Sequence, residues 1–474
     1  MTEQIPRGVL IGGAVLAPVF LVLLALSRPW YFTSETYLGG LLFLEFLVAA
    51  VWMFRQTFFP LVLIAFLFAG LNLAVGGFWT QGRWVFLGVG ALVGSIIVIK
   101  DRRFSFGVFH LLALFAVLAA LVSAAASHYP GFALLKALSL LLVFIYAATG
   151  ARLAVMGREN RFFEGLVTGC EIFIGAIMAF HLKGTEAMGN PNSLGAVTGV
   201  VGAPILLWGM LLDERPRVHY RRMALFAICV YLIFDSHARA AMAAAFVSCA
   251  LMCVSLRRYK LLAEGLTVIL VLVAAVGIWR PEELSNTVSS VTSSVVYKSK
   301  SSEVGLLASR EAPWQAALDT IRDNLWFGTG FGTTDNGRDA SEHLSKFSSM
   351  EGVTAENGSS YLAILTWVGV LGVLPFLLTL FVLIGSVVRT VSWMRKTGNV
   401  AHPAIPLAMV IVAGLVHASL EDWLFAPGYY LCVFFWSMAF VLVDLTPSVP
   451  LPRLAFASKP RPMRQDLAGV ASSR

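Results

Sequence analysis

Two consecutive apolar runs decide the fold class of this chain: GVFHLLALFAVLAALVSAAAS at residues 107–127 and GFALLKALSLLLVFIYAATG at residues 131–150. Each has the length, about 20 residues, at which an α-helix crosses the hydrocarbon core of a bilayer. Because only three residues separate the two runs, the helices would cross one membrane in opposite directions. The pair therefore predicts a membrane protein with several spans.

The composition extends this prediction to the whole chain. Of its 474 residues, 58% are hydrophobic and 13% charged, and the mean hydropathy is +0.78. Soluble globular proteins contain about 45–50% apolar and about 25% charged residues, so a soluble fold, a disordered chain and a single-anchor enzyme are excluded. All five cysteines lie in apolar runs without metal-ligand spacing and are expected to act as small hydrophobic side chains: Cys170, Cys229, Cys249, Cys253 and Cys432.

Fourteen apolar runs are candidate spans, and an all-α fold with about 12 to 14 transmembrane helices is expected. They lie at 8–27, 38–54, 59–79, 84–99, 107–127, 131–150, 162–182, 193–212, 223–236, 238–256, 261–279, 360–388, 403–420 and 424–446. Residues 1–279 would form an N-terminal bundle of about 11 spans, and residues 360–446 the C-terminal spans. The basic tail at 447–474 is expected to be disordered and cytoplasmic.

The distribution of Lys and Arg residues indicates how the chain is oriented in the membrane. About two thirds of the 35 Lys and Arg residues fall at the termini and in alternate connections, whereas the short connections on the opposite side carry only Arg28, Arg83 and Lys183. Cytoplasmic loops are the ones enriched in Lys and Arg. Both termini are therefore expected in the cytoplasm of a bacterial inner-membrane protein. The net charge of +8 then reflects topology, and no nucleic-acid partner is expected.

Residues 280–359 break the pattern, because they form one long polar loop on the non-cytoplasmic, periplasmic side. Within it, Ser309 can cap a helix whose apolar positions, from Trp314 to Leu325, recur at helical spacing. Gly328, Gly330 and Gly332 would then supply a flexible turn. The helix is expected to lie on the membrane surface, either as part of a functional site or as a structural lid.

Polar side chains inside apolar runs are costly unless they are paired or face water, and are therefore functional candidates. They are Lys136, Glu164, Glu171, His181, Asp235, His237, Arg239, His417, Glu421 and Asp422. Small neighbours leave Arg239 room to grip an oxyanion, although it could also be a helix-end anchor. Asn190 and Asn192 precede a span on the outer side, where they could bind sugar hydroxyls or cap the helix.

Four motifs in order resemble the O-antigen ligase and polysaccharide polymerase superfamily over roughly residues 185–445. They are GNPNSLG at 189–195, SHARAA at 236–241, the loop segment SREAPW at 309–314 with NLWFGTGFG at 324–332, and Tyr361-Leu362 followed by Gly369 and Gly372. No one motif is highly specific, but four of them in the right order around a long outer loop are together a fairly strong signal. The resemblance implies a fold like that of C-class glycosyltransferases and a metal-independent, cofactor-free reaction on glycans carried by undecaprenyl diphosphate.

The same resemblance implies roles for individual residues. Arg239 and Arg310 would hold the donor diphosphate, and a loop base would deprotonate the attacking sugar hydroxyl. The remaining substrate-binding candidates are Asn190, Asn192, His237, Trp314, His417 and Glu421.

The sequence departs from the family pattern at the base. Many relatives carry a His-Asn pair three residues before the Tyr-Leu, where this chain has Gly358 and Ser359. Glu356 and His343 are the nearest candidates for a catalytic base, and Glu356 is preferred. It could instead cap the following helix or pair with Lys346. The Glu-x-Gly-Ser-Ser segment resembles a variant among exopolysaccharide polymerases.

The preferred function is polymerisation of undecaprenyl-diphosphate-linked repeat units, with membrane lipid and a flippase and chain-length regulator as expected partners. Ligation of a lipid-linked glycan to another acceptor is the alternative within this class. Two other classes stay open: a transporter or lipid-linked-glycan flippase, for which repeated broken helices would be evidence, and a sensor or scaffold.

Overall fold

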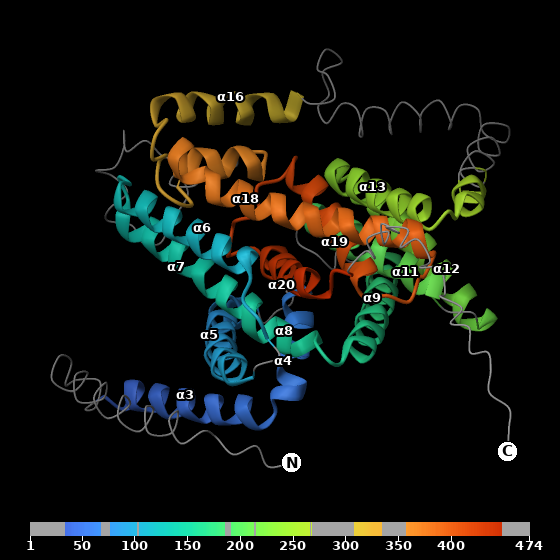
Figure 1. Cartoon of the computed structure of the whole chain (residues 1–474), viewed down its shortest axis with the longest axis horizontal. Helices are drawn as coiled ribbons and strands as arrows, with labels where there is room; N and C mark the ends of the chain where they lie inside the picture. The colour runs from blue at the N-terminus through green and yellow to red at the C-terminus, as the bar shows by residue number, and fades with distance from the viewer. Residues whose placement is uncertain are drawn as a thin grey trace, which may run out of the picture.

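The structure is a computed structural model that describes residues 34–67, 76–101, 104–184, 191–212, 215–265, 267, 308–333 and 357–447, and within these ranges the regular elements are all helices (Figure 1). The helices are α3 (Glu35–Met53), α4 (Arg55–Leu67), α5 (Gly76–Lys100), α6 (Val108–Ala125), α7 (Pro130–Tyr146), the π-helical turn η1 (Ala147–Ala151), α8 (Arg152–Val155), α9 (Glu159–Leu182), α10 (Pro191–Ala196), the π-helical turn η2 (Val197–Gly202), α11 (Ala203–Leu212), α12 (Pro216–Asp235), α13 (Arg239–Ser255), α16 (Ala308–Asp323), α18 (Ser360–Thr397), α19 (Ala404–Ala418) and α20 (Tyr430–Leu445). The prediction of an all-α polytopic membrane protein is confirmed.

Six of the described helical segments are long and apolar enough to cross a bilayer. They are Gly82–Lys100, Val108–Ala125, Pro130–Val155, Glu159–Leu182, Asn192–Leu212 and Ser360–Thr397. A seventh crossing results if α3 and α4, which bend by 107° at Phe54, form one broken span. The sequence predicts two separate spans there. The predicted span at 8–27 and most of that at 261–279 lie outside the described residues, so the total of 12 to 14 stays a prediction.

Three shorter apolar helices, α13, α19 and α20, complete the bundle. All side chains of α20 from Tyr430 to Leu442 are buried, and α20 lies at the centre of the bundle in Figure 1. A helix of 16 residues is short for a bilayer crossing. Because protein rather than lipid surrounds α20, neighbouring helices can satisfy the groups at its ends.

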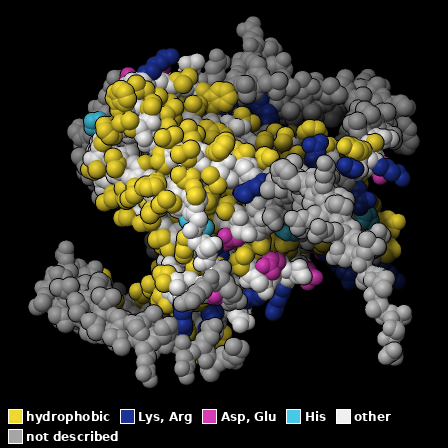
Figure 2. Space-filling model, in the orientation of Figure 1, with side chains coloured by type: hydrophobic (Ala, Val, Ile, Leu, Met, Phe, Trp, Pro, Cys, Tyr) yellow, Lys and Arg dark blue, Asp and Glu magenta, His cyan; other side chains and the backbone are white. Residues whose placement is uncertain are grey.

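The outer surface of α6, α7 and α18 is apolar. Phe115, Leu135 and Phe381 are 46%, 59% and 74% exposed, and hydrophobic side chains form a broad surface on this side of the molecule in Figure 2. An apolar surface of that extent is not stable against water. It is the surface that we expect lipid to cover.

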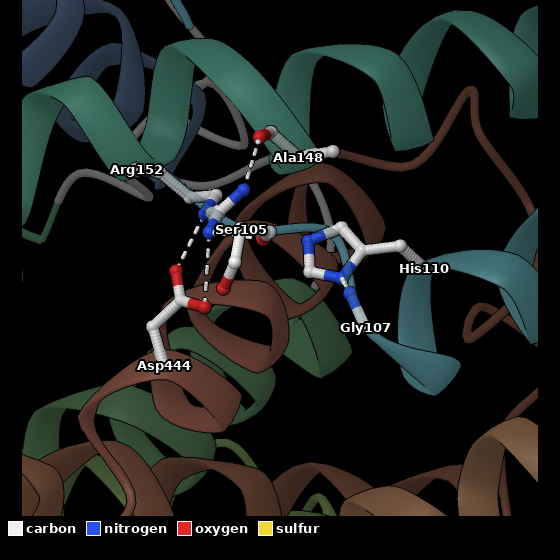
Figure 3. A network of polar contacts seen from close by, with 6 residues as sticks. All are labelled: Ser105, Gly107, His110, Ala148, Arg152 and Asp444. Atoms are coloured by element: carbon white, nitrogen blue, oxygen red, sulfur yellow. Dashed lines mark hydrogen bonds and ion pairs between the residues drawn. The ribbon is translucent and has the colours of Figure 1, made fainter. Parts of the chain in front are cut away.

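One end of the bundle is closed by a buried ion pair that joins α8, α20 and the segment that precedes α6 (Figure 3). Arg152 donates from Nε and Nη2 to the two carboxylate oxygens of Asp444 at 2.5 and 3.1 Å, and from Nη2 to the Ser105 carbonyl at 2.9 Å. Its guanidinium also lies over the rings of Phe104 and Phe106. We call this end the Arg152 end, and the opposite end, where α6 finishes and α7 and α20 begin, the loop end.

A second buried ion pair accounts for Glu171, one of the polar residues within the predicted spans. Glu171 of α9 is 8% exposed and accepts from Arg222 Nε at 2.9 Å and Arg221 Nη2 at 2.7 Å, both on α12. A buried acid with two guanidinium partners is electrically satisfied. Glu171 is therefore part of the contact between these two helices.

Candidate functional site

The candidate site is built around a break in α18. At Gly369 the backbone has φ 65° and ψ −176°, which are not helical values, so the helix is interrupted there. In an unbroken helix the amides of residues 370 and 371 would donate to the carbonyls of residues 366 and 367. Those four groups need other partners, because unpaired backbone groups in a membrane are costly.

The segment 324–333, which follows α16, supplies these partners. The amides of Thr329 and Gly330 donate to the carbonyls of Thr366 and Trp367 at 3.0 and 3.1 Å. From the other side of the break, the amides of residues 370 and 371 donate to the carbonyls of residues 325 and 326 at 2.9 and 3.3 Å. We call residues 324–333 the insert. It occupies the break and fixes α16 beside the first half of α18 (Figure 1).

Two glycines make this close approach possible. A Cβ on Gly328 would lie 2.4 Å from the Trp367 carbonyl group, and a Cβ on Gly369 would lie 2.4 Å from the Trp326 oxygen. Both residues also have positive φ, which favours glycine. The predicted glycine turn is therefore a specific backbone contact with α18.

α16 carries two of the predicted site residues toward the start of α18. Arg310 forms an ion pair with Glu421, which lies in the connection between α19 and α20. Trp314 donates from Nε1 to the Gly358 carbonyl at 3.2 Å. Gly358 has φ 65°, and a Cβ there would lie 3.4 Å from Arg310 Cδ and 3.2 Å from Trp314 Nε1. The position at which relatives carry histidine thus lies directly against Arg310 and Trp314.

Backbone contacts hold Glu421 in place. Ser360 donates to the Glu421 carbonyl from its amide at 3.0 Å and from its hydroxyl at 2.7 Å. Next to it, Asp422 accepts from the Asn357 amide at 2.9 Å. The structure therefore brings Arg310, Trp314 and Glu421, which sequence reasoning nominated separately, into one cluster at the start of α18.

The motif residues at Arg239 form a second cluster. Arg239 is the first residue of α13 and is partly buried, and the preceding His237 has φ 51° and an exposed side chain. A Cβ on Gly195 would lie 2.4 Å from Ala238 Cβ and 2.8 Å from Ser236 Oγ. The amide motif and the Ser-His-Ala-Arg motif are therefore in direct contact, which their separation in sequence does not reveal.

A tyrosine pair that sequence reasoning missed links the two clusters. Tyr430 donates to the Ser193 carbonyl at 3.1 Å, and the hydroxyl of Tyr429 donates to that of Tyr430 at 3.2 Å. Ser193 is adjacent to Asn192 in the amide motif, and Tyr429 packs on Trp423 two residues after Glu421. The feature of the sequence that could have pointed to this contact is the pair of consecutive tyrosines at the polar start of an apolar run.

Three of the predicted site residues, Glu356, His343 and Asn190, lie outside the described residues.

His417 is 3% exposed, and its Nδ1 accepts a hydrogen bond from Trp423 Nε1 at 2.8 Å. Since indole N–H is only a donor, Nδ1 carries no proton in this arrangement. His417 therefore supports Trp423, and its predicted role in lining a substrate cavity stays a prediction. Among the described residues no group of three His, Cys, Asp or Glu is arranged to hold a metal ion.

A titratable group also lies at the end of α12 next to the Arg239 cluster. His181 Nε2 is 3.1 Å from the Tyr231 hydroxyl, and His181 Nδ1 is 3.5 Å from Asp235. Asp235 and Arg239 are four residues apart. His181 was noted in the sequence only as a polar residue within a span.

Comparison with known families supports the motif assignment. Residues 224–377, about a third of the chain, match the family described as O-antigen ligase (Wzy_C). The matched region runs from α12 into α18 and includes Arg239, Arg310, Trp314 and the insert. The resemblance seen in the sequence motifs is thereby confirmed. No curated protein matches the chain.

Proposed function

We propose that this chain, a member of the O-antigen ligase and polysaccharide polymerase superfamily, polymerises lipid-linked oligosaccharide repeat units on the periplasmic face of the bacterial inner membrane. Members of the superfamily are membrane enzymes that transfer glycosyl groups from lipid-linked glycans. The donor in the proposal is a glycan on undecaprenyl diphosphate. The acceptor is a hydroxyl of an incoming repeat unit on its own carrier.

The cluster of Arg310, Glu421 and Trp314 is the observation that carries the proposal. The side chains of Arg310 and Glu421 are 17% and 20% exposed, so the pair is shielded but reachable. In such a setting a guanidinium binds phosphate strongly and in a fixed orientation. Glu421 would position Arg310, and the insert would hold α16, so that Arg310 is preorganised before the donor arrives.

In the proposed reaction the acceptor hydroxyl oxygen attacks the anomeric carbon of the donor. The bond from that carbon to the diphosphate oxygen breaks, a glycosidic bond forms, and the lipid diphosphate leaves as an anion. Arg239 and Arg310 would stabilise its charge as it develops. The proton of the acceptor hydroxyl goes to the base, which we assign to Glu356.

Gly358 favours a polymerase over a ligase. It occupies the position of the histidine of many relatives, and its lack of a side chain allows the contact with Arg310 and Trp314. The base would therefore come from elsewhere, and Glu356 is two residues away. Transfer to a different acceptor, as in a ligase, is the second candidate function. The size of the surface glycan in a deletion strain separates them, because single-repeat products indicate a polymerase and unattached full-length polymer a ligase.

The base assignment has its own test. Glu356→Gln keeps the shape and hydrogen-bonding reach of the side chain but removes its basicity, so it should shorten or abolish the polymer seen on a gel. His343→Ala is the matched variant and should leave polymer length unchanged. Full-length polymer from Glu356→Gln together with none from His343→Ala would transfer the role to His343.

The location of the site is tested by topology. Reporter fusions after Arg103, Arg222, Arg258 and Lys396 should report cytoplasm, and a tag at Thr334 should report the periplasm, because of the charge asymmetry. A cytoplasmic Thr334 tag contradicts the proposal, since the loop would then face away from the donor pool.

A further inference from the structure

A pair of cations at the loop end has no role in the site described above. Arg83 lies at the start of the α5 span and Lys136 lies six residues into the α7 span, about 9 Å along the helix at 1.5 Å per residue. Both side chains are partly buried. A cation as far inside a span as Lys136 is costly and usually marks a functional site.

Each of the two cations lies over an aromatic ring. The guanidinium of Arg83 lies over the Trp84 ring at 5.5 Å, and the ammonium of Lys136 lies over the Phe132 ring at 5.2 Å. The two charges are near enough to repel one another. Within the described part of the chain neither forms an ion pair with a carboxylate, and Arg83 Nε is buried without a hydrogen-bond partner. A bound anion would reduce the repulsion between the two cations and would accept a hydrogen bond from Arg83 Nε.

The pair contacts two segments that also support the proposed donor site. The stem of Lys136 packs on Gly332 of the insert, with Lys136 Cγ 3.0 Å from the position of a Cβ there. Arg83 Nη2 lies 3.9 Å from the corresponding Cβ position of Gly428. Gly428 belongs to the same connection as Glu421, the partner of Arg310. Glu421 and Gly428 are seven positions apart in the chain, so their Cα atoms are at most about 27 Å apart.

Polymerisation requires two lipid diphosphates at once. The donor releases its diphosphate during transfer, whereas the acceptor repeat unit stays on its own carrier throughout. We propose that Arg83 and Lys136 hold the diphosphate of the acceptor, beside the donor site at Arg239 and Arg310. This assignment rests on the proposed function and gives the acceptor a fixed place against the insert and the 419–429 connection.

The first experiment measures stoichiometry. Full-length protein in phosphatidylcholine nanodiscs is titrated with undecaprenyl diphosphate, and the wild-type chain should bind two molecules. Arg83→Gln with Lys136→Gln should leave one site, and Arg239→Gln with Arg310→Gln should leave the other. Lys183→Gln, an exposed cation on the same side, should retain both. One site in the wild type, or two in the Arg83/Lys136 variant, overturns the proposal.

The second experiment separates acceptor from donor in a single-transfer assay. The Arg83/Lys136 variant should raise KM for the acceptor by about tenfold or more, the effect of losing charge-assisted hydrogen bonds, with the donor KM nearly unchanged. Equal loss for both substrates, in protein of normal abundance, would contradict the assignment. Displacement of the second carrier molecule by phosphatidylglycerol at equal concentration would identify a general phospholipid site and likewise overturn it.

The two experiments also separate this proposal from the proposed function. If Arg239 and Arg310 variants polymerise normally, the donor assignment fails, but the binding titration still reads the Arg83 and Lys136 site. If those variants are inactive and the titration finds a single site, only the acceptor assignment fails.

Discussion

Two arginine–carboxylate pairs, one at each end of the bundle, share the same chemistry but differ in how far water can reach them. Arg152 and Asp444 at the Arg152 end have side chains that are 2% and 13% exposed, whereas Arg310 and Glu421 at the loop end are 17% and 20% exposed. Arg152 also donates to the Ala148 and Ser105 carbonyls and lies between aromatic rings. The same pairing thus serves helix packing at the Arg152 end, whereas at the loop end it leaves an arginine that the proposed donor diphosphate can reach.

The largest expected effect breaks the structural pair. Arg152→Ala leaves the Asp444 carboxylate and the two carbonyls without their partner in a buried place, which costs about 3–5 kcal/mol of folding free energy. We expect a large fall in the amount of folded protein, measured by fluorescence-detected gel filtration of membrane extracts. Replacing both partners by Leu should be much less damaging, because no charge is then left unpaired. If the double Leu variant loses as much folded protein as Arg152→Ala, the ion pair itself is needed for folding.

The loop-end pair should respond in the opposite way. Arg310→Ala should reduce polymer by about 100-fold or more, as expected when a donor to a developing anion is lost, with protein abundance close to wild type. Arg310→Lys should restore little activity because an ammonium does not reproduce the planar guanidinium. Near-normal polymer from Arg310→Ala would make this pair structural too, and the contrast between the two ends would disappear.

A substitution that disturbs the insert tests whether the insert holds Arg310 in place. Gly369→Ala places a Cβ 2.4 Å from the Trp326 oxygen at a positive φ, a strain of about 1–3 kcal/mol. We expect reduced polymer and a lower unfolding temperature. Gly385→Ala in the same helix is the control, since nothing lies within 4 Å of its Cβ position. Equal behaviour of the two variants would contradict the role of the break in α18.

The smallest effect should come from Trp314→Phe, which removes only the hydrogen bond from Nε1 to the Gly358 carbonyl. A single neutral hydrogen bond contributes about 1 kcal/mol, so polymer yield should fall by about fivefold. Trp326→Phe is the comparison, because Trp326 is 60% exposed. A larger fall in polymer yield from Trp326→Phe than from Trp314→Phe would indicate that the substrate contacts the insert rather than Trp314.

The sequence alone determined the membrane fold, the position of α16 and the resemblance to the O-antigen ligase family. These depend on local properties: apolar length, helical spacing and short motifs whose chemistry is written in consecutive residues. The charge asymmetry likewise led to a proposed orientation. Within the site, Arg239, Arg310, Trp314 and Glu421 were all nominated from their residue types and motifs.

Only the tertiary structure decided which of these residues meet. The pairing of Arg310 with Glu421 joins positions 111 residues apart, and the pairing of Arg152 with Asp444 joins positions 292 residues apart. No local pattern encodes such contacts, because they depend on how helices pack against one another. The break in α18 is the clearest case. The sequence marks Gly369 only as part of a motif, and its role becomes visible only with the insert that supplies the missing backbone hydrogen bonds.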